Sequence, residues 1–118
     1  MTVTEDLDRS VKLTAEGKWN EARKILIRLA RKGVMEAQFN LGLIYFNGYD
    51  VKPDYGKALK WYTKAAEGGN VLAMYYCGTI LENGDEGVPA NKKQAKKWYK
   101  MAADAGYDPA GAALGRMK

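Results

Sequence analysis

The stretch ALKWYTKAAEGG at Ala58–Gly69 recurs as AKKWYKMAADAG at Ala95–Gly106, 37 residues later. Both copies share an alanine, a tryptophan–tyrosine pair, two adjacent alanines and a closing glycine. The shared apolar residues follow the i, i+3, i+4, i+7, i+8 spacing of one helical face, so each copy predicts an amphipathic helix that ends at glycine. In the first copy these residues are Ala58, Trp61, Tyr62, Ala65 and Ala66.

A second unit alternates with the first. AQFNLGLIYFNG at Ala37–Gly48 matches AMYYCGTILENG at Ala73–Gly84 at an offset of 36 residues. A divergent copy of the first unit occupies Ala22–Gly33, and the start of the second unit returns at residues 110–115. A repeat of this length is typical of proteins built from stacked pairs of helices.

About seven helices are expected in this all-α chain of 118 residues, joined by short turns that make consecutive helices pack antiparallel. A stack of such pairs is an α/α solenoid, in which each repeat contacts only its neighbours. We expect a single domain over 1–118, with a degenerate cap pair at 1–34, repeats at 35–70 and 71–107, and a capping helix at 108–118. The helices are predicted near residues 5–16, 20–32, 35–47, 54–67, 71–83, 91–105 and 109–116.

The two units together resemble the Sel-one-like repeat family, a branch of the tetratricopeptide-like superfamily. The family pattern is A-x-x-x-L-G-x-x-Y-x-x-G, a loop with an aspartate, and then A-x-x-W-Y-x-x-A-A-x-x-G. The second copy departs from it at Cys77, Leu81 and Asn91, and the N-terminal pair lacks both the Leu-Gly and the Trp-Tyr residues. The first copy fills the pattern with Ala37, Leu41, Gly42, Tyr45, Gly48, Asp54, Ala58, Trp61, Tyr62, Ala65, Ala66 and Gly69.

The resemblance implies a right-handed superhelix and an adaptor or scaffold role. Family members hold protein complexes together in bacterial regulation, secretion and host interaction, or in eukaryotic quality control. They share a shape, while the partner depends on the surface that each one carries. We therefore expect a module that binds a protein or peptide partner.

Residues that could carry catalysis are scarce. The chain has no histidine and one cysteine, which removes the commonest general base and a cysteine zinc site. Cys77 takes the repeat position of Leu41, so it is expected in the core, and the Gly84–Gly87 segment is expected to be a solvated turn rather than a cation loop. The Trp-Tyr pairs are expected to pack between helices rather than form an aromatic cage. We expect no enzyme activity, cofactor, metal or small-molecule substrate.

Composition places few limits on the environment. No apolar run approaches the roughly 20 residues of a membrane-spanning helix, and the segment Met1–Arg9 has no apolar core of a signal peptide. A lone cysteine cannot form a disulfide within its own domain, so the fold needs no oxidising compartment. A cytoplasmic location is the resulting expectation.

By the resemblance, the first helix of each pair lines a concave groove. Side chains on this helix that the core does not need are partly aromatic, and they would form an apolar patch with a polar edge. The alternative is that curvature buries them against one another. The predicted groove residues are Phe39, Leu43, Phe46, Asn47, Tyr75, Thr79, Glu82 and Asn83.

The second helices carry most of the 19 basic residues, and the net charge is +5. A solvated outer face explains such a pattern, but a convex surface that binds nucleic acid or anionic lipid is the alternative function. A stack that serves only to dimerise through its ends is a further alternative. The basic residues are Arg23, Lys24, Arg28, Arg31, Lys32, Lys57, Lys60, Lys64, Lys92, Lys93, Lys96, Lys97 and Lys100.

Overall fold

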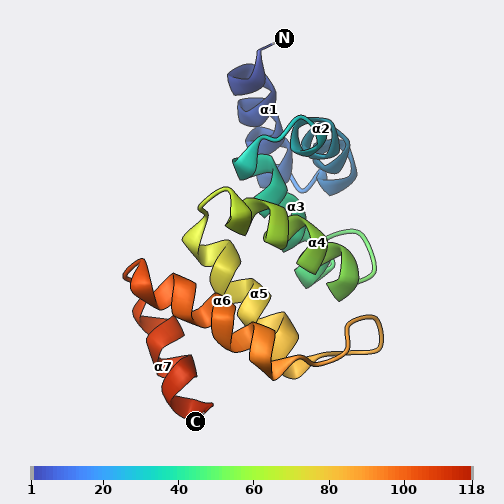
Figure 1. The fold of residues 1–118 in the computed structure, drawn as a ribbon. Helices are drawn as coiled ribbons and strands as arrows, with labels where there is room; N and C mark the ends of the chain where they lie inside the picture. Colours follow the sequence, from blue (N-terminus) through green and yellow to red (C-terminus); the bar gives the residue numbers. More distant parts are fainter. Residues whose placement is uncertain (1, 118) are drawn as a thin grey trace.

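The computed structural model describes residues 2–117, which form seven helices and one isolated β-bridge. Met1 and Lys118, the outer bounds of the predicted domain, lie outside these residues. The all-α prediction is confirmed (Figure 1). The helices are α1 (Val3–Ala15), α2 (Trp19–Arg31), α3 (Met35–Asn47), α4 (Tyr55–Glu67), α5 (Val71–Asn83), α6 (Lys92–Asp104) and α7 (Asp108–Arg116).

Every predicted helix is present, and each observed end lies within two residues of its predicted position. The largest shift is at α1, which begins earlier because Thr2 and Glu5 form a capping box. The Glu5 amide donates to Thr2 Oγ1 at 3.1 Å, and the Thr2 amide donates to Glu5 Oε1 at 3.2 Å. These bonds satisfy amides that a helix start otherwise leaves unpaired.

The helices stack in chain order, and each packs mainly against the helix before it and the helix after it. Figure 1 shows the stack running from the N-terminus at one end to the C-terminus at the other. The molecule is elongated, with extents of 47 × 29 × 22 Å. The predicted α/α solenoid is confirmed.

The core has two parts that meet at the Trp61–Tyr62 pair. Trp61 packs with α1–α3, whereas Tyr62 packs with α4–α7. Both side chains are buried, as is Tyr99 in the next copy of the pair, so the predicted packing role is confirmed for these three residues. Trp98, the fourth, is half-buried and packs against the same part of the core as Tyr62. Cys77 is also fully buried, and burial raises the pKa of its thiol to about 12.

Two glycines set how closely the two helices of one pair approach each other. A Cβ on Gly42 would lie 2.6 Å from the Tyr62 ring, and one on Gly78 would lie 2.6 Å from the Tyr99 ring. The same glycine recurs in the sequence as Gly115, which predicts an equally close approach at α7, and this prediction is wrong. A Cβ there would meet nothing within 4 Å, because no helix of the described chain packs on that side of α7.

The Gly84–Gly87 segment is a turn, as predicted. Asp85 Oδ1 accepts hydrogen bonds from the amides of Gly87 at 2.9 Å and Val88 at 3.0 Å. Asp85 and Val88 also form the β-bridge. Because the carboxylate is engaged by the backbone of its own loop, the turn has a structural explanation that needs no cation.

Candidate protein-binding surface

The first helices of successive pairs enclose a hollow of about 300 Å³ between α1 and α3, here called the α1–α3 hollow. Of the predicted groove residues, Leu43 lines it. Val11 also lines it and is 54% exposed, which makes it the most exposed large apolar side chain of the described residues. The complete lining is Ser10, Val11, Thr14, Trp19, Leu26, Glu36, Asn40, Leu43 and Ile44.

Farther along the stack, aromatic side chains fill the space between the first helices. The ring centroid of Phe46 lies 5.2 Å from that of Tyr55 and 5.7 Å from that of Tyr76. Tyr75 lies 5.2 Å from Tyr107, and Phe39 lies 5.6 Å from the buried Tyr62 ring by the same measure. These predicted groove residues are half-buried, so each contributes one face to the core and leaves part of its surface accessible.

Four predicted residues are polar, and three of them, Asn47 on α3 and Thr79 and Asn83 on α5, form no hydrogen bond with a charged side chain of residues 2–117. Asn47 and Asn83 are exposed, and Asn47 Nδ2 donates to the Leu43 carbonyl at 3.1 Å. Asn83 and Thr79 line a small cavity of about 60 Å³ together with Phe46. This cavity is too small for a peptide side chain larger than a few atoms, so the α1–α3 hollow is the more open part of this face.

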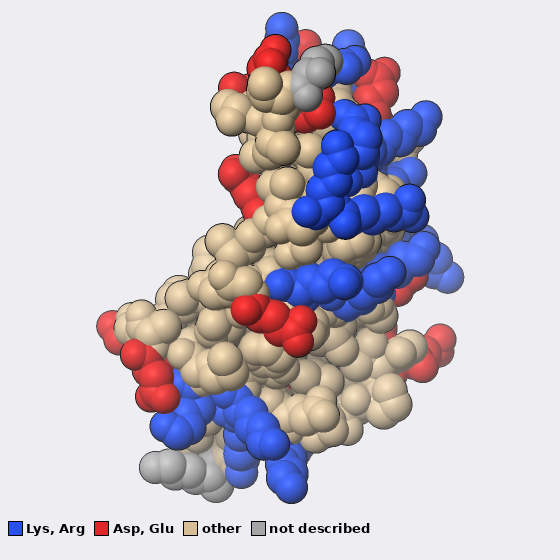
Figure 2. All heavy atoms as spheres, turned by 45° about the horizontal axis from the view of Figure 1, so that its top comes forward, with Lys and Arg blue, Asp and Glu red and all other residues tan. Residues whose placement is uncertain are grey.

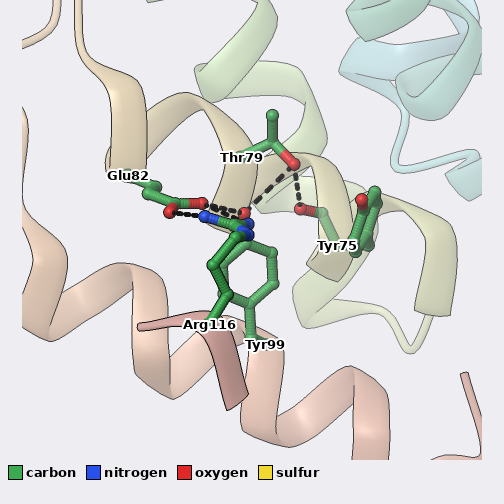
Figure 3. Close-up of polar contacts among 5 residues, drawn as sticks. All are labelled: Tyr75, Thr79, Glu82, Tyr99 and Arg116. Carbon is green, nitrogen blue, oxygen red and sulfur yellow. Dashed lines mark hydrogen bonds and ion pairs between the residues drawn. The ribbon is translucent and has the colours of Figure 1, made fainter. Parts of the chain in front are cut away.

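Glu82, the last predicted residue, is engaged within the chain (Figure 3). The guanidinium of Arg116 donates to both carboxylate oxygens, and the Tyr99 hydroxyl donates to Glu82 Oε1 at 2.8 Å. Hydrogen bonding by Arg116 holds the pKa of Glu82 below its ordinary value, and burial raises that of Tyr99 to about 12. The network ties α5 to both α6 and α7, so the role of Glu82 shown by these contacts is structural.

Glu82→Gln is expected to reduce the loss of stability in acid. The folded-state pKa of Glu82 lies below the unfolded value, so its interactions stabilise the fold above the unfolded pKa and are lost as the pH falls through the folded one. Urea unfolding between about pH 7 and about pH 3 measures this. Glu86→Gln, at an exposed loop residue, is the matched control. An unchanged pH profile in Glu82→Gln would contradict the assignment.

The basic residues of the second helices do not form one uniform free surface. Arg28 pairs with Asp6 at 2.8 Å, and Lys100 pairs with Asp104 at 3.1 Å. Lys57 and Lys60 instead place their ammonium groups over aromatic rings. The predicted basic face is therefore partly neutralised, and the cations left unpaired within residues 2–117 are spread over α2, α4 and α6.

Other sites of chemistry are sparse in the described structure. Residues 2–117 contain no group of three or more side chains that could together hold a metal ion. Cys77 Sγ lies 3.7 Å from Thr63 Oγ1 in the interior, where no nucleophilic use of the thiol follows from its raised pKa. Within the same range, none of the helices combines the length and apolar character that a membrane span needs.

Comparison with known proteins agrees with the repeat geometry. The family model described as the Sel1 repeat matches residues 36–70 and 71–107, which together make up more than half of the chain. This chain belongs to the Sel1-repeat family. The resemblance predicted from the Leu-Gly and Trp-Tyr motifs is confirmed. Sel1 repeats form a non-enzymatic scaffold family whose members are typically protein–protein interaction modules.

Relatives of this Sel1-repeat chain are mostly longer. The Sel1-repeat-containing protein YjcO of Escherichia coli K12 is 36% identical over 68% of this chain, which spans 36% of YjcO. The ERAD-associated E3 ubiquitin-protein ligase component HRD3A of Arabidopsis thaliana is 34% identical over 59% of this chain and 10% of its own. The chain thus spans about a third of YjcO and a tenth of HRD3A.

Solved structures share the fold. A Sel1 repeat protein from Oxalobacter formigenes has a TM-score of 0.81 and 29% identity, covering 92% of this chain and 44% of that one. The c5321 protein, a protective antigen of uropathogenic Escherichia coli with an SLR fold, has a TM-score of 0.77 and 37% identity, covering 84% of this chain and 21% of that one. Both likenesses support the helical stack in Figure 1.

Proposed function

We propose that this chain is a non-catalytic adaptor that binds a protein or peptide partner along the face of its first helices. The observation that carries the proposal is the α1–α3 hollow of about 300 Å³, with Val11 exposed at its rim. Exposed apolar surface beside a hollow is the usual form of a binding site for a partner side chain. Family membership supports protein binding as the general role.

The lining of the α1–α3 hollow favours a partner that inserts one apolar side chain from an extended segment. Val11, Trp19 and Leu43 supply apolar surface, while Asn40 and Glu36 supply polar groups at the same hollow. An apolar side chain would sit among the first group, and the amide of Asn40 could pair with the partner's backbone. The predicted groove residues from Phe39 to Asn83 would then extend contact along α3 and α5.

We also propose the setting in which this chain works, namely a protein complex and its location in the cell. HRD3A is named as a component of a ubiquitin ligase, which is an example of a relative that works within a complex. We place this chain in the cytoplasm, because its single cysteine is buried and forms no disulfide, so the fold needs no oxidising compartment. We also take residues 1–34 and 108–118 as caps on the two repeats.

Val11→Glu is expected to weaken peptide binding about tenfold or more, because it puts a charge at the rim of an apolar hollow. Ligands would be selected from a displayed library of random dodecapeptides, and their affinity for the purified chain measured by fluorescence polarisation. The matched control is Val3→Glu, which makes the same change on the same helix at a residue that is 43% exposed and does not line the hollow.

Both substitutions are at exposed positions, so each is expected to change the free energy of unfolding by about 0.5 kcal/mol or less. Thermal melts would verify that the two variants are equally folded. The groove proposal is wrong if the library enriches no peptide, or if the enriched peptides bind Val11→Glu and Val3→Glu with the same affinity.

A further inference from the structure

A second recess lies between α2 and α4, the second helices of successive pairs. It has a volume of about 180 Å³ and is here called the α2–α4 cleft. Three of its side chains are cationic and the others are aliphatic or aromatic, so a basic rim surrounds an apolar floor. The lining residues are Ile27, Arg31, Tyr45, Lys57, Lys60 and Trp61.

The charge at this cleft is not neutralised within the described chain. Arg31, Lys57 and Lys60 form no ion pair with any carboxylate of residues 2–117, in contrast to Arg28, which pairs with Asp6. Arg23 lies two helical turns before Arg31. One of its guanidinium nitrogens is buried and has no hydrogen-bond partner among residues 2–117. In Figure 2, basic side chains lie in rows across the face that carries α2 and α4, with uncharged surface between the rows.

The lysines are held over the floor of the cleft by its aromatic rings. Lys57 Nζ lies 5.4 Å from the ring centroid of Tyr45, and Lys60 Nζ lies 5.0 Å from that of Trp61. Contacts of this length are favourable cation–π interactions. They reduce the freedom of two long side chains, so less entropy is lost when an anion orders them further.

We propose that the α2–α4 cleft binds an acidic peptide segment, a docking site separate from the α1–α3 hollow. Carboxylates of the segment would pair with Arg31 and with the lysines of α4. The guanidinium of Arg31 can accept a carboxylate in a bidentate arrangement. An apolar side chain between the carboxylates would lie on the floor formed by Ile27 and Trp61.

Two features favour a peptide over nucleic acid. Single-stranded nucleic acid binds by stacking its bases on exposed aromatic faces. Trp61 is only 8% exposed and Tyr45 is half-buried, and each ring has a lysine ammonium group over it. A cleft of 180 Å³ with a partly apolar floor also matches a peptide side chain better than a continuous phosphate backbone.

The test uses a fluorescein-labelled peptide in which glutamates flank a central leucine pair, titrated by fluorescence polarisation at low and at physiological salt. The wild-type chain is expected to bind it, with lower affinity at physiological salt. The double variant Arg31→Glu/Lys60→Glu is expected to lose about tenfold or more in affinity. The control Lys93→Glu/Lys96→Glu makes the same charge change on α6, outside the cleft, and is expected to stay within about twofold.

Three results would overturn the proposal. The first is no binding of the peptide at low salt. The second is an equal loss of peptide affinity in Arg31→Glu/Lys60→Glu and in Lys93→Glu/Lys96→Glu, which would mean that binding depends only on net charge. The third is tighter binding of a labelled oligothymidine through Arg31 and Lys60, which would make nucleic acid the occupant. Val11→Glu is expected to bind the acidic peptide normally, so failure at the α1–α3 hollow and failure at this cleft give different results.

Discussion

Tyr62→Ala is expected to lower the free energy of unfolding by about 3–5 kcal/mol. Tyr62 is fully buried, and its ring centroid lies 5.1 Å from that of Tyr76 and 5.6 Å from that of Phe39. It also fills the space beside Gly42 in α3, so its removal leaves a cavity bordered by α3, α4 and α5. Urea denaturation followed by circular dichroism measures the change. Since small domains are stable by about 5–15 kcal/mol, this single truncation removes a large part of the total.

The phenol ring, rather than its hydroxyl, is expected to account for this loss. The Tyr62 hydroxyl is buried and has no hydrogen-bond partner among residues 2–117. Tyr62→Phe is therefore expected to leave stability unchanged or to raise it, because an unsatisfied buried polar group is removed. Tyr99, at the same position of the next repeat, donates its hydroxyl to Glu82. Tyr99→Phe is expected to cost about 1–2 kcal/mol.

This pair of conservative substitutions separates packing from hydrogen bonding at equivalent repeat positions. If Tyr62→Phe were as destabilising as Tyr99→Phe, Tyr62 would have a polar partner that the described contacts lack. If Tyr62→Ala were tolerated with a loss below about 1 kcal/mol, the ring could not be the link between neighbouring helix pairs.

The helices could be predicted because the chain repeats its own helix signals. Each copy of the Ala58–Gly69 pattern has one apolar face and ends at a glycine, so periodicity and helix ends agree three times over. The structure accordingly places Gly33, Gly69 and Gly106 at positive φ after α2, α4 and α6. The early start of α1 was also encoded, since Thr2 and Glu5 match a capping box, but the prediction did not use that signal.

The binding face was harder to predict because it depends on how far each helix turns toward its neighbour. Periodicity identifies Phe39, Phe46 and Tyr75 as side chains that the core does not strictly need. It does not show that Tyr76 of α5 contacts the rings of Phe39 and Phe46, or that Tyr107, in the turn before α7, contacts the ring of Tyr75. The Glu82–Arg116 pair joins residues 34 positions apart, and no local pattern predicts such a contact. The predicted groove residues therefore remain candidates for binding a partner, and the structure shows that they also contribute to packing within the chain.

The pairing of the basic residues on the second helices was likewise not predictable from the sequence. The sequence shows that the second helices are rich in basic residues, but only the structure shows that Asp6 neutralises Arg28 while Arg31 and Lys60 stay unpaired within the described chain. Asp6 comes from α1, and its nearly buried carboxylate has a pKa lowered chiefly by the hydrogen bond from Arg28. Composition therefore predicted the excess of positive charge, whereas the meeting of Arg31, Lys57 and Lys60 at the α2–α4 cleft follows from tertiary contacts.

Gly42→Ala and Gly78→Ala are each expected to lower the free energy of unfolding by about 1–3 kcal/mol. The added methyl group would lie 2.6 Å from the ring of Tyr62 in the first case and of Tyr99 in the second. Both rings are buried and cannot move aside without disturbing the core, so the two helices must separate. Urea denaturation of each variant measures the loss, and the similar geometry predicts similar values for the two repeats.

Gly115→Ala is the matched control, since it adds the same methyl group at the corresponding position of α7, where nothing lies within 4 Å. There the change is expected to stabilise the chain by about 0.5–1 kcal/mol, because alanine loses less backbone entropy than glycine in a helix. Stability changes of opposite sign at Gly42 and Gly115 would show that close approach between the two helices of a pair, rather than helix propensity, explains why glycine occupies this position inside the stack. Stabilisation at all three positions would instead mean that the two helices within each pair are not packed as closely as these contacts require.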